Sequence, residues 1–434
     1  MPRHSMNKRD FLRTLGGTLG GSMVGASVGR SVLGAWFSDE QLARYAALPA
    51  TALAEDEAFW ARIRAGFRLT DAYINLENGF FCLQPQEVLE AFIAHVRDIN
   101  LEASHYMRTR QGDDKLAVRT RLASLAGCSP QELIITRNTT ESLDTVVAGY
   151  NWKAGDEAVM AEQDYGAMLD QFKLQARRYG IVNRVVSIPM DPASDDEVVQ
   201  VYANAITPRT RLLMVCHMVN ITGHVLPVRK IAEMAHAKGV DVMVDGAHAF
   251  AHLDFRIPDL GVEYYGASLH KWLATPLGAG VLYVRRDKIA GLWPIYGDAG
   301  PADDDIRKLN HTGTHPVHTD LAINNAIDYH LAIGAARKEA RLRYLQNYWV
   351  SKVRGMRGII LNTPTDPRRS CAIANVGVKG IAPGDLMDIL MKKYRIWTVA
   401  IDGAGVHGVR VTPHLFTNTA ELDAFVKALG ELAA

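Results

Sequence analysis

The stretch from Val240 to Arg286 reads VDVMVDGAHAFAHLDFRIPDLGVEYYGASLHKWLATPLGAGVLYVRR, and it decides the fold class of the chain. It holds three short apolar runs typical of buried strands: VDVMV, which is followed by Asp245, EYYGA, which leads to Ser268, and GAGVLYV. Polar side chains stand at the carboxyl ends of the first two runs, where ligands bind in open α/β sheets. The stretch therefore predicts neighbouring strands whose ends carry a polar site.

These polar side chains match the needs of an aldehyde cofactor, pyridoxal phosphate (PLP). PLP takes a lysine as its Schiff-base partner, a carboxylate to keep its pyridine nitrogen protonated, and donors for its phosphate. Lys271 and Asp245 supply the first two groups, and Ser268 and His270 supply donors. A single lysine after a strand is usually a surface residue. The matching groups around Lys271 favour the cofactor interpretation.

The order DGAHA, SLHKWL and GAGVLYV resembles the class V group of fold-type I PLP enzymes, and the resemblance covers most of the chain. QDYGAMLD at residues 163–170 and GVRVTPHLFTN at residues 408–418 are most similar to the isopenicillin N epimerase-like branch. That branch holds epimerases, carbon–sulfur lyases, transaminases and siderophore-maturation enzymes. The resemblance implies PLP as the cofactor and a homodimer, but it leaves the reaction open.

Alternation of strands and helices predicts the architecture. Seven strand-like runs recur, namely LIIT, EAVMA, NRVVSI, RLLMVCH, VDVMV, EYYGA and GVLYV, with helical stretches between them. This pattern indicates an α/β fold with a doubly wound, mainly parallel seven-stranded sheet. We expect a leader at residues 1–37, a helical arm at 38–75, a large PLP-binding domain at 76–325 and a smaller α+β C-terminal domain at 326–434.

A phosphate cradle is expected after the run LIIT. The following segment, TRNTTESLDTVVAGY, predicts a helix that begins near Glu141. Free N–H groups at a helix N-terminus bind phosphate, so we expect Thr139, Thr140 and Glu141 to contact the cofactor. Thr139 or Thr140 can equally be the N-cap of the helix, and both roles can hold together.

The resemblance implies further cofactor contacts. Tyr165 stands where the family places an aromatic ring or a histidine over the pyridine face; ordinary core packing is the alternative. His248 resembles the donor to the ring hydroxyl, with a satisfied core histidine as the alternative, and Asn220 is expected at the same hydroxyl. Thr314, in HTGTH, is similar to a segment that reaches the phosphate of the neighbouring subunit, which implies a two-fold homodimer with shared active sites.

Substrate contacts are expected from two further segments. Arg410, inside the run GVRVT, has the planar fork that binds an α-carboxylate bidentately; a structural ion pair is the alternative. Asn78, in an Asn-Gly turn, is expected near the substrate mouth. A third segment also borders the expected substrate site without an assigned role for any member: His105, Tyr106, Arg108 and Arg110.

The expected function is that of a PLP-dependent enzyme. Lys271 would remove a proton from Cα of an amino acid or of an amino-acid-containing secondary metabolite, while Asp245 keeps the ring cationic. Epimerisation, transamination and elimination all follow from this step and stay open. A non-catalytic PLP-fold module that binds a partner or regulates is the alternative, and the retention of Asp245 and Lys271 counts against it.

Composition and cysteine spacing indicate which kinds of partner and site to expect. A formal net charge of +1 and a pI near 7.8 show no basic bias, so nucleic acid is not an expected partner. The four cysteines lack CxxC spacing, which indicates neither a metal site nor a disulfide framework. A cysteine desulfurase needs a nucleophilic cysteine on a mobile loop. Cys371 instead opens the strand-like run CAIANVGV.

The N-terminal leader resembles a twin-arginine export signal. Lys8 and Arg9 precede Phe11 and Leu12, and a mildly apolar, Gly-rich run follows. Lysine in place of the first arginine is a departure from the usual pair, and Arg30 interrupts the apolar region. We expect a periplasmic location, with a disordered cytoplasmic leader as the alternative. The run is too short and Gly-rich for a stable membrane span.

Overall fold

The computed structural model describes residues 37–434. The predicted export signal therefore lies outside the described residues. From residue 37 onward, no helix combines the length and the hydropathy of a membrane span. Across the same residues, no three His, Cys, Asp or Glu side chains are grouped so that they could hold a metal ion.

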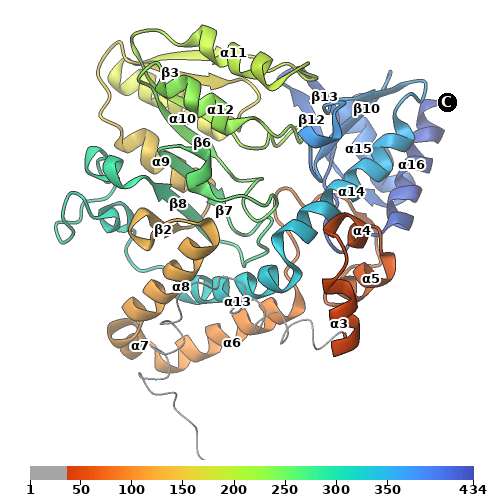
Figure 1. Ribbon diagram of the computed structural model, residues 1–434, viewed down its shortest axis with the longest axis horizontal. Helices are drawn as coiled ribbons and strands as arrows, with labels where there is room; N and C mark the ends of the chain where they lie inside the picture. The colour runs from red at the N-terminus through yellow and green to blue at the C-terminus, as the bar shows by residue number, and fades with distance from the viewer. Residues whose placement is uncertain (1–36) are drawn as a thin grey trace, which may run out of the picture.

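A seven-stranded sheet forms the centre of the large domain, in the order β2-β8-β7-β6-β5-β3-β4 (Figure 1). The strands are β2 (Leu133–Thr136), β3 (Glu157–Ala161), β4 (Val182–Val186), β5 (Thr210–Cys216), β6 (Asp241–Asp245), β7 (Tyr264–Ser268) and β8 (Gly280–Val284). β8 runs antiparallel to β2 and β7, and the other neighbouring pairs are parallel. The predicted doubly wound, mainly parallel sheet is confirmed.

Both faces of this sheet are covered by helices. One apolar core packs beneath α8 (Gln111–Ala126), α11 (Asp195–Ala205), α12 (Val228–His236) and α13 (Val317–Ile333), and a second packs beneath α9 (Thr139–Gly149) and α10 (Gly166–Tyr179). Neighbouring strand residues alternate between these cores: Leu213 and Val242 face the first, and Met214 and Met243 face the second. Burial on both faces explains why these strands are continuous apolar runs.

The smaller C-terminal domain has its own sheet and core. Its antiparallel sheet has the order β12-β13-β10-β9. Its elements are α14 (Ala335–Val353), β9 (Ile359–Leu361), β10 (Ala374–Val378), α15 (Pro383–Tyr394), β11 (Ile396–Trp397), β12 (Val399–Gly403), β13 (Val406–Val411) and α16 (Thr419–Ala433). The predicted boundary at residues 325 and 326 falls inside α13, and the chain leaves the large-domain core at Gly334, between α13 and α14.

The N-terminal arm packs against this C-terminal domain (Figure 1). Its helices are α3 (Asp39–Ala46), α4 (Ala50–Ala54) and α5 (Glu57–Ala65). Ion pairs join Glu57 to Arg341 of α14 and Arg64 to Glu421 of α16. The following strand, β1 (Ile74–Asn75), pairs in parallel with β11. Because β1 pairs with a strand of the C-terminal domain, the segment after β1 starts at that domain and leads from it to the large domain.

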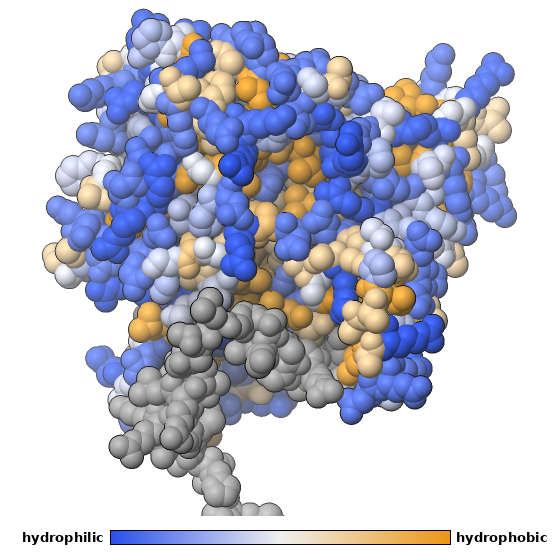
Figure 2. Space-filling view, viewed as in Figure 1, coloured by the Kyte–Doolittle hydropathy of each residue, from blue (hydrophilic) through white to orange (hydrophobic). Residues whose placement is uncertain are grey.

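The remaining elements are short or lie beside the large domain: α6 (Gln86–Glu102), α7 (Ser104–Thr109), and the 3₁₀ helices η1 (Pro130–Glu132), η2 (Ile257–Leu260), η3 (Arg286–Gly291), η4 (Ile306–Asn310) and η5 (Pro367–Arg369). α6 packs with α13 and lies below the sheet in Figure 1. In the space-filling view, apolar residues gather in a hollow near the centre of the face shown (Figure 2).

Candidate active site

A pocket of about 250 Å³ lies at the carboxyl ends of β5, β6 and β7. Its lining comes from both domains and from the segment after β1: Gly79, Phe80, Asn138, Thr139, Thr140, Tyr165, Cys216, Met218, Asn220, Asp245, Ala247, His248, Ser268, His270, Lys271, Leu277 and Arg410. Most residues that the sequence singles out for cofactor and substrate therefore meet in one pocket. Glu141, Thr314 and Asn78 do not line it.

The N-terminus of α9 forms one wall of the pocket. The helix begins at Thr139, and Asn138 is its N-cap, with the side-chain oxygen accepting from the backbone N–H of Glu141 at 2.9 Å. The expectation of a start near Glu141 capped by a threonine is therefore wrong. Asn138 has the stronger cap preference, and that preference could have identified it. The Thr139 N–H donates to Oγ of Ser268 at 2.9 Å, which joins the helix start to the end of β7.

Two glycines let α9 lie this close to the sheet. A Cβ atom on Gly280 would stand 2.6 Å from the backbone nitrogen of Asn138. A Cβ atom on Gly266 would stand 2.7 Å from a side-chain carbon of Leu143. Any larger residue at either position would push the helix away from the pocket. The helix N-terminus, with its partial positive charge, is therefore held where an anionic phosphate fits.

Lys271 and Asp245 face the pocket from neighbouring strands. Lys271 lies in the turn after β7, where burial lowers its pKa to about 8 and the charge of Asp245 opposes the shift. Asp245 ends β6, where burial raises its pKa; an N–H from Ala247 at 2.9 Å and the charge of Lys271 oppose the shift. A buried carboxylate in this setting suits a cationic ligand group such as a pyridinium.

Two histidines complete the cofactor side. Nε2 of His248 lies 3.1 Å from Nζ of Lys271. His270 is half-buried, and desolvation lowers its pKa to about 4, with the charge of Lys271 adding to the shift, so its ring is neutral at pH 7. Its Nδ1 atom is buried and has no hydrogen-bond partner among the described residues.

The donor set fits PLP on these observations. Phosphate would lie at the α9 N-terminus with Thr140 and Ser268, and Asp245 would hold the ring nitrogen. Tyr165, the N-cap residue of α10, lines the open side of the pocket with a side chain that is 45% exposed, so it is free to stack on a ring. Asn220 lines the pocket in the turn after β5.

Arg410 of β13 enters the pocket already paired. Its Nη2 and Nε atoms donate to the two carboxylate oxygens of Glu77 at 2.6 and 3.2 Å, and both side chains are buried. Nη1 donates to the carbonyl oxygen of Asn220 at 3.3 Å. The ion pair that the sequence left as an alternative is therefore present, and Arg410 still lines the pocket beside Asn220. Sequence reasoning missed Glu77, which no motif marks.

Asn78 has a structural position under the pocket mouth. It is fully buried, and its side-chain amide donates to the carbonyl oxygen of Thr412 at 2.8 Å and accepts from Asn75 at 3.0 Å. The next two residues, Gly79 and Phe80, line the pocket in its place. Their N–H groups donate to Oε1 of Glu77 at 3.1 and 2.9 Å. Glu77 thus holds both the mouth turn and Arg410.

Several other expected residues lie elsewhere. Glu141 pairs with Arg137 and borders an adjoining cavity of about 570 Å³. Thr314 is exposed. The segment around α7 makes local contacts: Tyr106 donates to Asp114, Arg110 pairs with Glu102, and His105 lies 3.8 Å from Glu102, while Arg108 is exposed. None of these α7 side chains lines the pocket that holds Lys271.

The cysteines are free thiols in protected positions. Cys82, Cys216 and Cys371 are buried, and burial raises the pKa of each. Cys128 is half-buried with its pKa likewise raised to about 12 by desolvation. Cys371 precedes the strand rather than opening it, because β10 begins at Ala374. A raised thiol pKa leaves little thiolate at neutral pH, which disfavours a nucleophilic role.

Comparisons with known proteins agree with this geometry. A family model for class V aminotransferases matches residues 82–423. The chain is 30% identical over 393 residues to an isopenicillin N epimerase of Amycolatopsis lactamdurans, covering 86% of this chain and 98% of that one. It is 26% identical over 358 residues to a probable cysteine desulfurase of Xylella fastidiosa, covering 76% of this chain and 83% of that one.

Solved structures share the fold. A cysteine desulfurase from Thermococcus onnurineus superposes with a TM-score of 0.76 at 20% identity, covering 86% of this chain and 97% of that one. The cystine C–S lyase C-DES superposes with a TM-score of 0.74 at 23% identity, covering 84% of this chain and 98% of that one. These likenesses confirm a fold-type I α/β domain with a smaller C-terminal domain.

Proposed function

The chain belongs to the class V aminotransferase family, and we propose that it is an enzyme that moves a proton at Cα of an amino acid or of an amino-acid-containing secondary metabolite. Family membership confirms PLP as the cofactor. The observation that carries the proposal is the convergence of Lys271, Asp245 and the N-terminus of α9 in one pocket.

Each residue has a distinct task in this proposal. When bound, PLP supplies an aldehyde that bonds to amines and a ring that withdraws electrons from Cα. Asp245 holds the ring nitrogen in its protonated form, and the α9 N-terminus with Ser268 binds the phosphate. Lys271 would be the amine that holds the cofactor at rest and the base that accepts the Cα proton, since burial lowers its pKa to about 8.

Substrate orientation falls to the other end of the pocket. Arg410 presents its Nη1 end beside Asn220, where it can bind a carboxylate through charge-assisted hydrogen bonds. Glu77 keeps the guanidinium in that orientation. Phe80 and Leu277 provide apolar walls and are 76% and 58% exposed. A substrate with an α-carboxylate and a partly apolar side chain suits this arrangement.

Among the possible outcomes, the relatives support epimerisation. Two isopenicillin N epimerases, from Amycolatopsis lactamdurans and Streptomyces clavuligerus, each align over 98% of their length. A desulfurase reaction is disfavoured because the four cysteines have raised pKa values rather than a reactive thiolate. Transamination and elimination give products that differ from those of epimerisation, and the experiment below distinguishes them.

The test uses the full chain loaded with PLP and a panel of D- and L-amino acids in D₂O. Chirality, keto acid, released sulfide and deuterium at Cα are scored separately. We expect deuterium at Cα that depends on Lys271, with Lys308→Met as the control because Lys308 is also buried and has a pKa lowered by burial but does not line the pocket. Bound PLP without exchange in any amino acid would favour the non-catalytic module instead.

We also propose that the enzyme is a homodimer. The cavity beside the pocket shares Asn138, Thr140 and Tyr165 with it, and Ile295 and Tyr296 expose apolar surface there. A second copy would cover this surface. Light scattering across a dilution series tests the proposal, and a monomer at every concentration would contradict it.

Export through a twin-arginine route is proposed from the sequence of residues 1–37. A protein that acquires its cofactor in the cytoplasm must cross the membrane folded, and the Lys8-Arg9 pair supports such a route. We expect the leader to carry a folded reporter to the periplasm and Arg9→Lys to retain it. A reporter that stays cytoplasmic with the native leader would contradict the location alone.

A further inference from the structure

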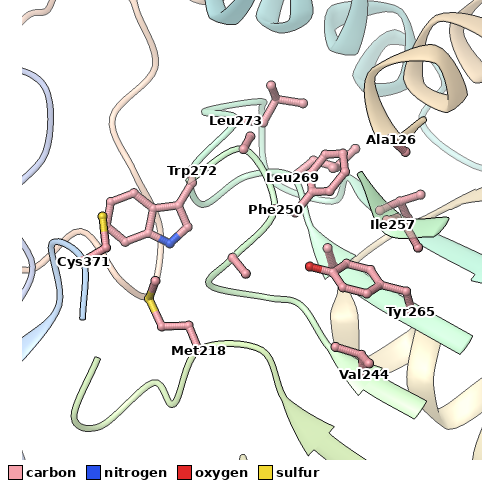
Figure 3. Close-up of a cluster of buried hydrophobic side chains, with 14 of the residues drawn as sticks. Ala126, Met218, Val244, Phe250, Ile257, Tyr265, Leu269, Trp272, Leu273 and Cys371 are labelled. Atoms are coloured by element: carbon pink, nitrogen blue, oxygen red, sulfur yellow. The ribbon is translucent and has the colours of Figure 1, made fainter. Parts of the chain in front are cut away.

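Trp272, the residue after Lys271, is locked in place by neighbours from both domains. Its side chain is fully buried, in the cluster that Figure 3 shows with Met218 and Cys371. The indole stacks on His252 with ring centroids 3.7 Å apart and on His414 with centroids 5.4 Å apart. With both contacts fixed, the direction of the indole N–H is fixed as well.

That N–H points at His248. Nε1 of Trp272 donates to Nδ1 of His248 at 3.3 Å. An indole nitrogen can only donate, so Nδ1 must be the acceptor and carry no proton. Burial lowers the pKa of His248 well below its ordinary value, and the nearby charges of Lys271 and Arg410 act in the same direction. The ring is therefore neutral, and when the amine of Lys271 is neutral as well its single proton is on Nε2.

The protonated nitrogen faces the reactive centre. Nε2 of His248 lies 3.1 Å from Nζ of Lys271, and both residues line the pocket. We propose that Trp272 is a positioning residue that fixes the Nε2–H tautomer of His248 and so presents a hydrogen-bond donor to the pocket. Without the indole N–H, the ring could place its proton on Nδ1 and turn a lone pair toward the cofactor.

The tautomer of His248 would affect how the protein binds the ring hydroxyl of PLP. This consequence rests on the proposed function. A donor at Nε2 stabilises an oxygen anion on the ring hydroxyl, whereas a lone pair there would repel it. The carbonyl oxygen of Trp272 also accepts from Lys338 of α14, so the C-terminal domain holds the backbone of the same residue. The packing of the C-terminal domain therefore helps to fix Trp272, and through Trp272 it fixes the Nε2 donor of His248.

The first test measures the tautomer in the full chain without PLP at about pH 9.5, where Lys271, with its pKa of about 8, is a neutral amine that can accept from Nε2. Histidines are labelled with ¹⁵N, and the His248 signals are assigned by their loss in His248→Gln. We expect protonated Nε2 and bare Nδ1 in the wild type, and a mixture of tautomers in Trp272→Phe, which keeps the stacking but removes the N–H. A wild type with a proton on Nδ1 overturns the proposal even if the variant fails to fold.

The second test adds PLP. Trp272→Phe should bind PLP about tenfold more weakly, in line with the loss of one hydrogen bond to a charged group, and should show a shifted absorption spectrum of the bound cofactor. Trp152→Phe is the matched control, because it removes an indole N–H that donates to the carbonyl oxygen of Val147 at 2.8 Å, outside the pocket. Equal effects of the two substitutions would overturn the proposal. If PLP does not bind the wild type, the proposed function fails while the tautomer measurement still stands.

Discussion

The two ends of the pocket differ in whether their charged groups are paired within the protein. At the cofactor end, Lys271, Asp245 and the first turn of α9 converge on a pocket that a ligand can fill. At the substrate end, Arg410 and Glu77 form a buried ion pair with each other.

This difference has a physical reason. A cofactor of fixed chemistry can supply a cationic ring nitrogen to Asp245 and an anionic phosphate to the helix N-terminus, so these groups need no permanent partner of opposite charge. A substrate carboxylate binds and leaves in every catalytic cycle. The guanidinium that binds it has a permanent partner, which holds its orientation when no substrate is bound. Substitutions at the first end should therefore change chemistry most, and substitutions at the second should change stability and affinity.

The largest effect is expected from Lys271→Ala. It removes the amine that bonds to PLP and the base at Cα, so turnover should fall by at least about 10³-fold, within the range for loss of a positioned general base. Borohydride reduction of the wild type followed by peptide mapping should find PLP on Lys271. Attachment to Lys338, a buried lysine whose pKa burial also lowers to about 8, would contradict the assignment.

Asp245→Asn should leave PLP bound but slow turnover by about 10²–10³-fold, comparable to the loss of one preorganised electrostatic group. The neutral amide cannot hold the ring nitrogen in its protonated form. Steady-state kinetics with matched PLP occupancy measures the effect. Asp164→Asn is the control, since Asp164 is also buried but does not line the pocket, and an equal loss in both variants would contradict a specific role.

The substrate end is probed by a double-mutant cycle. Arg410→Met leaves Glu77 buried without its cation and should lower the free energy of unfolding by about 3–5 kcal/mol. Adding Glu77→Gln should recover part of this loss, with a coupling of about 1–3 kcal/mol. Urea unfolding of all four proteins measures the cycle. Additive effects would mean that the pair does not act as a unit.

The smallest effect is a pH dependence at the cofactor end. Because burial lowers the pKa of Lys271 to about 8, the free amine increases as the pH rises through 8 instead of near 10.5. Covalent attachment of PLP to the cofactor-free chain should therefore accelerate by about tenfold between pH 7 and pH 9. Stopped-flow absorbance follows the reaction. A rise centred near the ordinary lysine value would show that Lys271 is not desolvated.

Local patterns in the sequence predicted which strand ends would lie together at the cofactor end. The runs before Asp245 and Ser268 became β6 and β7, which are neighbours in the sheet, so their ends had to meet. The sequence predicts the start of α9 near Glu141, two residues late, because Asn138, Thr139 and Thr140 are all N-cap residue types and only the structure shows that Asn138 caps the helix. Arg410 was found from its apolar surroundings, whereas Asn78 turned out to support the mouth from below.

By itself, the sequence determined the order of the strands along the chain, the strand ends that carry Asp245 and the lysine turn, and the cofactor that these groups suit. These features depend on periodicity and on residues close in the chain, which local physics controls. Only the tertiary structure decided that Glu77 holds Arg410 across 333 residues of sequence and that Trp272 directs its N–H at His248. Those contacts depend on how two domains pack and on side-chain direction, and neither leaves a mark in a local pattern.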